Sequence, residues 1–325
     1  MLPFVIVSHA LPENWLKKLE NHCRFVIGPE RGDGFAPELQ EHLANAEGIL
    51  TMLTVPVNKA FLTQAPKLRV VSNMAVGVDN IDLIACVERG IPVGHTPGVL
   101  VEGTADMTLT LLLAAARRLV EASDDARNGH WTTWTPTAWL GTDLHGATLG
   151  IVGMGKIGQA AAARAKAFGM NIVYNSRSPK LEAEARLDAK RLSLDGLLAQ
   201  SDFVSLHTPL TPETRHLIDT AALKKMKSTA ILVNMARGPV VDTNALVQAL
   251  QEGWIQAAAL DVTDPEPLPS DHVLYSLRNC VIAPHIGSAT QHTRRRMAEL
   301  ACDNLLAGLN GRRLPHCANP KVYEK

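Results

Sequence analysis

Three glycines at fixed spacing form the chemical motif that says most about this chain. Gly153, Gly155 and Gly158 fit G-x-G-x-x-G, with Lys156 and Ile157 between the second and third glycines. In this motif the first glycine allows a tight turn, the second lets the backbone approach a pyrophosphate, and the third lets helix and strand pack closely. The N–H groups at the start of the following helix attract phosphate. We therefore predict that this turn, Lys156 and Ile157 included, binds a dinucleotide.

The sequence on both sides of the glycines supports this interpretation. The apolar run LGIV precedes them, an alanine-rich helical pattern follows and ends at Gly169, and the run NIVY comes next. Strand, turn, helix and strand in this order are the context that the motif requires. The ordinary alternative is a βαβ unit that is merely rich in glycine.

The residues at the end of the second predicted strand indicate which dinucleotide fits. An NAD-binding unit usually carries Asp or Glu there, where the carboxylate holds the ribose 2′-hydroxyl. This chain has Asn175, Ser176 and Arg177 instead, so no carboxylate would repel a 2′-phosphate. Arg177 can pair with that phosphate, and Ser176 can donate a hydrogen bond to it. We expect NADP(H) to be preferred over NAD(H), unless Arg177 is only a solvated loop residue.

Three ionisable side chains stand just beyond predicted strands, where ligands bind in open α/β sheets. Arg237 comes after the apolar run AILVNM, and its guanidinium can hold carboxylate and carbonyl oxygens. His285 comes after the run CVIAP, and an imidazole can give or take a proton near neutral pH. Glu266 lies between two prolines, and a carboxylate on so stiff a loop suits orienting an imidazole. By position alone, Arg237 could equally be a surface residue, while a structural role for His285 and a polar turn for Glu266 would be the more common alternatives.

The composition limits the partners and the compartment. The 325 residues allow about two domains, and 32 basic residues balance 32 acidic ones, which argues against nucleic acid or an anionic membrane as a partner. The five cysteines are scattered without zinc spacing, so we expect reduced thiols, no metal site and a cytoplasmic location. The N-terminus lacks the pattern of a signal peptide, and no apolar run is long enough to span a bilayer.

Strands and helices are predicted to alternate along both halves of the chain. The first half has strand patterns in PFVIV, GILTML, LRVVSNM and IPVGHT and a helical pattern in PENWLKKLENH. The second half has LGIV, NIVY, SDFVSLH, TAILVNM, IQAAALDV and NCVIAPH. A long helical pattern from about Thr104 separates the halves, and a last one, closed by Gly308 and Gly311, ends the chain. This alternation predicts an α/β fold with two doubly wound parallel sheets; which sheet the last helix covers is left open.

Three longer blocks resemble the D-isomer-specific 2-hydroxyacid dehydrogenases over nearly the whole chain. They are LGIVGMGKIGQAAAARAKAFGM, SDFVSLHTPLTPETRHLIDTAALKKMKSTAILVNMARGPVVDTNALVQAL and AALDVTDPEPLPSDHVLYSLRNCVIAPHIGSAT. Within the family the chain looks most similar to NADP-dependent glyoxylate/hydroxypyruvate reductases, including bacterial enzymes that also reduce 2-ketogluconate. The resemblance implies a discontinuous, flavodoxin-like substrate domain over 1–103 plus 289–325. It also implies a Rossmann-like dinucleotide-binding domain over 104–288 and an active-site cleft between the two.

The activity that the resemblance implies is NADPH-dependent reduction of small 2-keto acids. In the family's Arg–Glu–His set, Arg237 would bind the substrate, Glu266 would orient the imidazole and His285 would act as acid and base. One alternative is an NAD-linked member of the family acting on another substrate. A second alternative is a dinucleotide-sensing corepressor, which can retain the same three residues.

The loop MAVGVDNIDL, at 74–83, resembles the family's substrate-carboxylate loop. The backbone N–H groups of Val76 and Gly77 would bind the anion as a small nest. The family's usual first glycine is Ala75 here, a departure from the family's pattern. Met52 would also contact the substrate, although a core position suits this apolar side chain equally well.

Four further residues would line the cofactor site if the resemblance holds. His207 and Pro209 would lie on the nicotinamide side, and Met235 and Asp261 would hold the carboxamide. The alternatives are burial in a strand for Met235 and a polar strand end for Asp261.

Three tryptophans, Trp131, Trp134 and Trp139, precede the first strand of the second half. Family members dimerise through the region after the long helix, so we expect a homodimer with these aromatic residues at its interface. Trp139 would reach toward the partner's active site, unless all three simply pack in the core.

Overall fold

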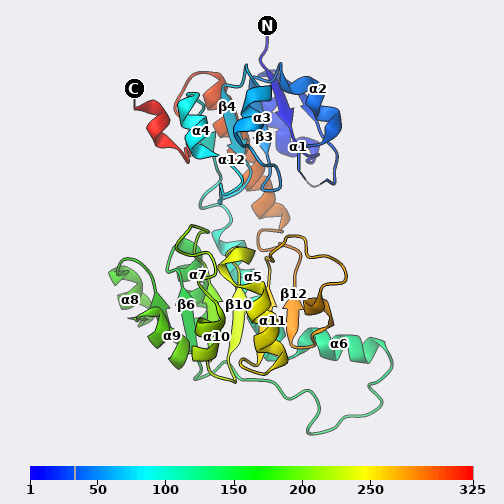
Figure 1. The fold of residues 1–325 in the computed structure, drawn as a ribbon, viewed down its shortest axis with the longest axis vertical. Coiled ribbons are helices and arrows are strands. Elements are labelled where there is room, and N and C mark those ends of the chain that lie inside the picture. The colour runs from blue at the N-terminus through cyan, green and yellow to red at the C-terminus, as the bar shows by residue number, and fades with distance from the viewer. Residues whose placement is uncertain (33, 325) are drawn as a thin grey trace. The chain divides into compact units, whose positions relative to one another are not determined.

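The computed structural model describes residues 1–32 and 34–324, and the chain divides into two compact units. Unit 1 combines Met1–Leu100 with the stretch from Thr290 to the C-terminal end, and unit 2 is Val101–Ala289. Each unit has one sheet whose strands all pair in parallel, with helices along it (Figure 1). Two parallel-sheet α/β units confirm the fold class predicted from the alternation of strands and helices.

The sheet of unit 1 has five strands in the order β2-β1-β3-β4-β5. This order is that of flavodoxin-like doubly wound sheets. The strands are β1 (Phe4–Val7), β2 (Arg24–Ile27), β3 (Gly48–Thr51), β4 (Val70–Asn73) and β5 (Val93–Gly94). The helices are α1 (Glu13–Leu16), α2 (Gln40–Leu43), α3 (Lys59–Gln64), α4 (Leu83–Glu88) and α12 (Gln291–Leu309), with 3₁₀ turns at Lys17–Leu19, Pro37–Leu39 and Pro320–Tyr323.

The C-terminal helix α12 packs on the sheet of unit 1. A Cβ added to Gly308 would lie 2.5 Å from Val70 Cγ2, so this glycine lets the helix approach β4 closely. Ser72 Oγ donates a hydrogen bond to the carbonyl of Ala301 at 2.7 Å. The expectation that Gly308 helps to end the helix is wrong, because α12 continues to Leu309, and Gly311, with φ of 66°, follows its end.

The sheet of unit 2 has seven strands in the order β12-β11-β10-β9-β6-β7-β8. Counted from β6, this is the Rossmann order 3-2-1-4-5-6 with one further strand. The strands are β6 (Thr148–Val152), β7 (Asn171–Asn175), β8 (Lys190–Arg191), β9 (Phe203–Leu206), β10 (Ile231–Asn234), β11 (Ala257–Leu260) and β12 (Cys280–Ile282). The helices are α5 (Val101–Ala116), α6 (Leu119–Arg127), α7 (Lys156–Ala167), α8 (Leu181–Leu187), α9 (Leu194–Gln200), α10 (Thr220–Lys225) and α11 (Thr243–Gln251), with 3₁₀ turns at Gly238–Val240 and Val273–Ser276.

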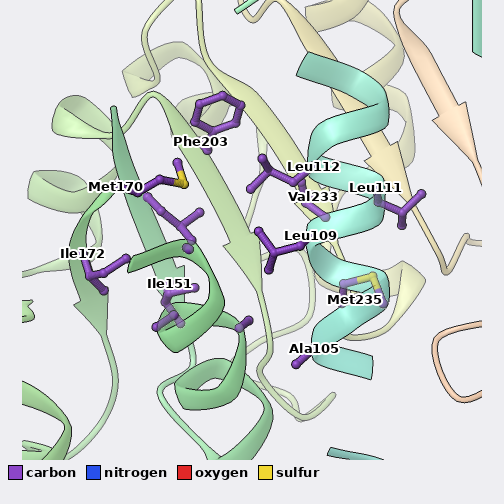
Figure 2. Close-up of a cluster of buried hydrophobic side chains, with 14 of the residues drawn as sticks. Ala105, Leu109, Leu111, Leu112, Ile151, Met170, Ile172, Phe203, Val233 and Met235 are labelled. Atoms are coloured by element: carbon purple, nitrogen blue, oxygen red, sulfur yellow. The ribbon is translucent and has the colours of Figure 1, made fainter. Parts of the chain in front are cut away.

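Two hydrophobic clusters cover the two faces of this sheet. Successive strand side chains point to opposite faces, so Ile151 joins one cluster and Val152 the other. Figure 2 shows the first cluster, in which Leu109 and Leu112 of α5 point toward the sheet and Ile151 belongs to the same cluster. The apolar strands predicted from the sequence are therefore buried on both faces, as parallel sheets require.

The long helix expected from Thr104 is interrupted. Its first part, α5, ends at Ala116, and Arg118 takes a left-handed conformation with φ of 50° before α6 begins. No residue of α6 is buried. The structure also adds β2 and the two-residue β8, which the sequence pattern did not indicate. Across the residues described, no helix has the length and apolar character needed to cross a membrane.

Candidate active site

The glycine-rich turn joins β6 to α7 at the carboxyl edge of the sheet of unit 2. Gly153 has φ of 100°, and a Cβ there would lie 2.7 Å from the carbonyl carbon of His207. A Cβ on Gly158 would collide with the carbonyl oxygen of Gly153. Gly155 has no neighbouring atom within 4 Å of an added Cβ, and Lys156 beside it is exposed. The open N-terminal turn of α7 therefore fits a pyrophosphate, and the flanking glycines are required for its shape.

The loop after β7 contains the residues predicted to select the dinucleotide. Asn175 Nδ2 donates to the carbonyl of Leu192 at 2.9 Å, and Ser176 Oγ donates to the carbonyl of Ser178 at 2.6 Å. The Arg177 side chain is exposed. Arg191 of β8 donates from Nη2 to the carbonyls of residues 176 and 177, at 3.0 and 3.1 Å. Sequence reasoning missed Arg191, because its role depends on backbone carbonyls brought near by a strand that the pattern did not predict.

His207 directly follows β9 and lies beside the glycine turn. Burial lowers its pKa to about 4, so the imidazole is neutral at neutral pH. Ser205 Oγ lies 2.9 Å from His207 Nε2. His207 Nδ1 and Thr208 Oγ1 are buried and have no hydrogen-bond partner among the described residues. Pro209, next in the chain, is exposed.

Glu266 and His285 form a close pair. His285 Nδ1 lies 2.6 Å from Glu266 Oε1, and the N–H of Thr263 donates to Glu266 Oε2 at 3.1 Å. Burial raises the pKa of Glu266, but the hydrogen bond and charge of His285, the N–H of Thr263 and the charge of Arg237 together lower it by more, so the net shift is downward. The carboxylate accepts, so Nδ1 carries the proton, and Nε2 is the ring atom that can exchange one.

Asp261 fixes the backbone around His285. Its carboxylate accepts the N–H groups of Ile286 at 2.7 Å and Gly287 at 2.8 Å, and its carbonyl accepts the N–H of His285 at 2.9 Å. His285 itself has φ of 52°, an uncommon conformation for a residue other than glycine. Burial raises the pKa of Asp261 despite these two hydrogen bonds. Sequence reasoning assigned Asp261 to the carboxamide and did not foresee this positioning role.

Met235 is buried beside these residues. It is 8% exposed and belongs to the hydrophobic cluster of Figure 2. A Cβ added to Gly287 would lie 3.1 Å from Met235 Cε. The structure thus gives Met235 a packing role, and its contact with a carboxamide stays a prediction.

Arg237 comes after β10, close to the Glu266–His285 pair. Its Nη1 donates to the carbonyl of Ala236 at 2.8 Å, and its charge helps to lower the pKa of Glu266. A Cβ on Gly238 would collide with the carbonyl of Thr263, so the chain can turn here only with glycine. Because β10, β11 and β12 are neighbours, Arg237, Glu266 and His285 gather at one edge of the sheet.

The residues expected to bind substrate in the N-terminal half lie in unit 1. Met52 follows β3 and is half-buried, and Val76 and Gly77 lie in the loop after β4. Neither Val76 nor Gly77 has a positive φ, and binding of the substrate's carboxylate by their N–H groups stays a prediction. The carbonyls of Ala75, Val76 and Gly77 each accept a hydrogen bond from elsewhere in unit 1. Within the described part of the chain, no group of three or more His, Cys, Asp or Glu residues could hold a metal ion.

The sheet order, the open glycine turn and the Arg–Glu–His group define a dinucleotide-binding oxidoreductase. The family model described as D-isomer specific 2-hydroxyacid dehydrogenase, NAD binding domain, matches residues 109–287. The chain belongs to this family and is an oxidoreductase acting on 2-hydroxy acids.

Relatives match the chain over its full length. The glyoxylate reductase of Thermococcus kodakarensis is 48% identical over 100% of this chain and 98% of its own. The glyoxylate/hydroxypyruvate reductase B of Erwinia tasmaniensis is 47% identical over 99% and 100%. Among solved structures, a Thermus thermophilus protein has a TM-score of 0.90 and 50% identity, covering 97% of this chain and 99% of its own. An NADPH-dependent glyoxylate/hydroxypyruvate reductase from Sinorhizobium meliloti, in complex with NADP and malonate, has a TM-score of 0.86 and 31% identity, covering 98% and 97%.

Proposed function

We propose that this protein catalyses NADPH-dependent reduction of small 2-keto acids. Glyoxylate and hydroxypyruvate are the proposed substrates, and 2-ketogluconate is a further one. The observation that carries this proposal is the 2.6 Å contact between Glu266 and His285, with Arg237 on the neighbouring strand end. The names of the relatives at 47–48% identity support the choice of substrates.

Reduction of a 2-keto acid needs a hydride, an anchor for the substrate and a proton. The bound dinucleotide supplies the hydride. Arg237 binds the carboxylate and polarises the ketone through its paired N–H donors. His285 donates a proton from Nε2 to the oxygen that gains charge, because Glu266 occupies Nδ1. Glu266 also stabilises the imidazolium that is present before this transfer.

We propose that unit 2 is the dinucleotide-binding domain, over about 104–288, and that the remaining residues form the substrate domain. The glycine turn and the neutral His207 would contact the dinucleotide in unit 2. The substrate's carboxylate would bind the 74–83 loop, with Met52 nearby. Exposed Pro209 and the buried pair of Met235 and Asp261 would complete the nicotinamide side.

We propose that the enzyme prefers NADP(H) to NAD(H). The end of β7 offers an amide, Asn175, where a carboxylate would repel a 2′-phosphate. The Arg177 side chain is exposed, and Arg191 donates a hydrogen bond to the backbone carbonyl of Arg177. The S. meliloti relative binds NADP according to its description.

Steady-state kinetics test both parts of the proposal. Glyoxylate, hydroxypyruvate, 2-ketogluconate and pyruvate would each be measured with NADPH and with NADH. We expect the highest kcat/KM for glyoxylate or hydroxypyruvate with NADPH. Turnover with NADH alone would favour an NAD-linked member of the family. Dinucleotide binding without turnover of any 2-keto acid would favour the corepressor alternative.

A further inference from the structure

Three successive peptide carbonyls in the loop after β4 each accept a hydrogen bond. The carbonyl of Ala75 accepts from the N–H of Thr96 at 2.8 Å. The carbonyl of Val76 lies 3.0 Å from His95 Nδ1, and the carbonyl of Gly77 accepts from Asn73 Nδ2 at 2.9 Å. The donors come from the end of β4 and from the segment after β5.

Holding these carbonyls fixes the direction of the N–H groups that follow them. In a trans peptide the carbonyl of one residue and the N–H of the next point in opposite directions. The N–H groups of Val76, Gly77 and Val78 therefore point away from the three donors. None of these N–H groups donates to an acceptor within the described residues, and all three residues are partly exposed. Such groups are stabilised by an acceptor from solvent or from a ligand.

His95 can form its hydrogen bond with the carbonyl of Val76 only as the donor. A carbonyl oxygen accepts and does not donate, so His95 Nδ1 carries a proton in the neutral ring as well as in the charged one. The backbone of His95 is itself fixed by α12. Asn304 Nδ2 donates to the carbonyl of His95 at 2.9 Å, and Asn304 is completely buried.

Asn73 is likewise fixed by its surroundings. Its side chain is completely buried, and Nδ2 also donates to Asn80 Oδ1 at 3.2 Å. Asn80 Nδ2 in turn donates to the carbonyls of Met52 at 3.1 Å and Val55 at 2.9 Å. This polar network ties the loop to the residues that follow β3.

We infer that His95 and Asn73 are positioning residues for the substrate's carboxylate. By holding the carbonyls of Val76 and Gly77, they aim a row of backbone N–H groups at the anion. The inference rests on the proposed function, which assigns the carboxylate to this loop. Neither side chain needs to contact the substrate, so both act through the backbone.

The test replaces His95 while leaving the catalytic group intact. His95→Leu removes the donor, and His95→Asn restores one, because the amide Nδ2 stands near the place of Nδ1. His95→Leu should raise KM for glyoxylate about 3- to 10-fold, the size of one hydrogen bond, with kcat close to wild type. His95→Asn should recover most of the loss. Asn73→Asp, which replaces a donor with an acceptor, should raise KM in the same way.

Two further measurements separate this inference from the proposed function. The dissociation constant of malonate, measured by calorimetry on the dinucleotide-loaded protein, should rise in His95→Leu as KM does. His22→Leu, the same change at an exposed histidine of unit 1, should leave both values unchanged. Unchanged KM and malonate affinity in His95→Leu, or loss that His95→Asn does not reverse, would overturn the inference. If the wild type turned over no 2-keto acid, the proposed function would fail while malonate binding still tested the loop.

Discussion

At the scale of single residues, the pair of Glu266 and His285 is proposed to carry out the proton transfer. His285→Ala should lower kcat by roughly 10²–10⁴-fold, the usual contribution of a positioned acid or base. The dissociation constant of NADPH, measured by fluorescence, should change little, because the imidazole is not expected to hold the dinucleotide. His292→Ala, at an exposed histidine, provides the control. Near-normal turnover in His285→Ala would remove this residue from the mechanism.

Glu266 should also affect stability in acid. Burial raises its pKa, but the hydrogen bond and charge of His285, the N–H of Thr263 and the charge of Arg237 together lower it below the ordinary value of 4.5. Because the folded-state pKa is depressed, the ionised carboxylate stabilises the fold above that ordinary value, and this contribution is lost as pH falls through the lowered pKa. The Tm of the wild type should therefore fall more steeply than that of Glu266→Gln on acidification below pH 4.5.

Circular dichroism at a series of pH values gives these Tm curves. Glu30→Gln, at an exposed glutamate of unit 1, should follow the wild-type curve. The difference should be small, because the Glu266 side chain is 33% exposed and solvent screens part of its interaction with His285. Parallel curves for Glu266→Gln and the wild type would show that the pair does not contribute to folding.

At the scale of elements, the loop between β7 and α8 is proposed to determine the preference between cofactors. Arg177→Ala removes the cation proposed to pair with the 2′-phosphate. Hydrogen bonds to charged groups contribute about 1.5–3 kcal/mol, or roughly 10–150-fold in affinity. KM for NADPH should therefore rise at least about tenfold, while KM for NADH stays similar. Both constants should be measured at fixed ionic strength.

The choice of variant follows from the structure of this loop. Asn175→Asp, which would place a carboxylate at the end of β7, would also break the hydrogen bond from Asn175 Nδ2 to the carbonyl of Leu192. Arg177→Ala leaves that bond in place. Arg186→Ala, on α8, removes the same charge nearby and should leave the ratio of the two KM values unchanged. A wild type that prefers NADH, or an Arg177→Ala variant that keeps its preference for NADPH, would show that this loop does not select the cofactor.

The sequence predicted elements best where steric demands and periodicity coincide. The unit from β6 through the glycine turn to β7 could be predicted, because each glycine meets a requirement of the turn and apolar runs flank it. The break at Arg118 could not, since neither glycine nor proline marks it and the apolar pattern continues into α6. The strand β8 has two exposed residues and no apolar pattern.

The residues of the site also divide into those that a local sequence pattern indicates and those that it does not. Residues with distinctive chemistry, such as Arg237 and His285, could be proposed from their types and their places after strands. Asp261, His95 and Arg191 act by hydrogen bonds to or from backbone groups far away in the sequence. Such contacts depend on the strand order and on the packing of side chains, so no local pattern indicates them.

At the scale of the whole molecule, unit 2 exposes an apolar segment that its own sheet does not cover. In α6 no residue is buried, and the segment after it extends away from the sheet (Figure 1). Trp131 is 72% exposed and Trp134 is 78% exposed, while Leu119 and Leu140 are 60% and 65% exposed.

A cavity of about 290 Å³ opens beside α6, and Leu140 is part of its lining. Exposed apolar surface next to a cavity is typical of an interface with another chain. The tryptophans are therefore not core residues, which corrects one of the two readings of this segment.

We expect a homodimer, in which the α6–Trp134 segments of two copies cover each other about a two-fold axis. Such an interface uses the same patch on both copies, so one substitution changes it twice. Light scattering at micromolar concentration should give twice the chain mass of 35.1 kDa. Trp134→Lys should shift the protein toward the monomer, whereas Ile84→Lys, at a 74% exposed position of unit 1, should not. A monomeric wild type, or equal dissociation by both variants, would contradict this arrangement, because of these two side chains only Trp134 is proposed to lie between the subunits.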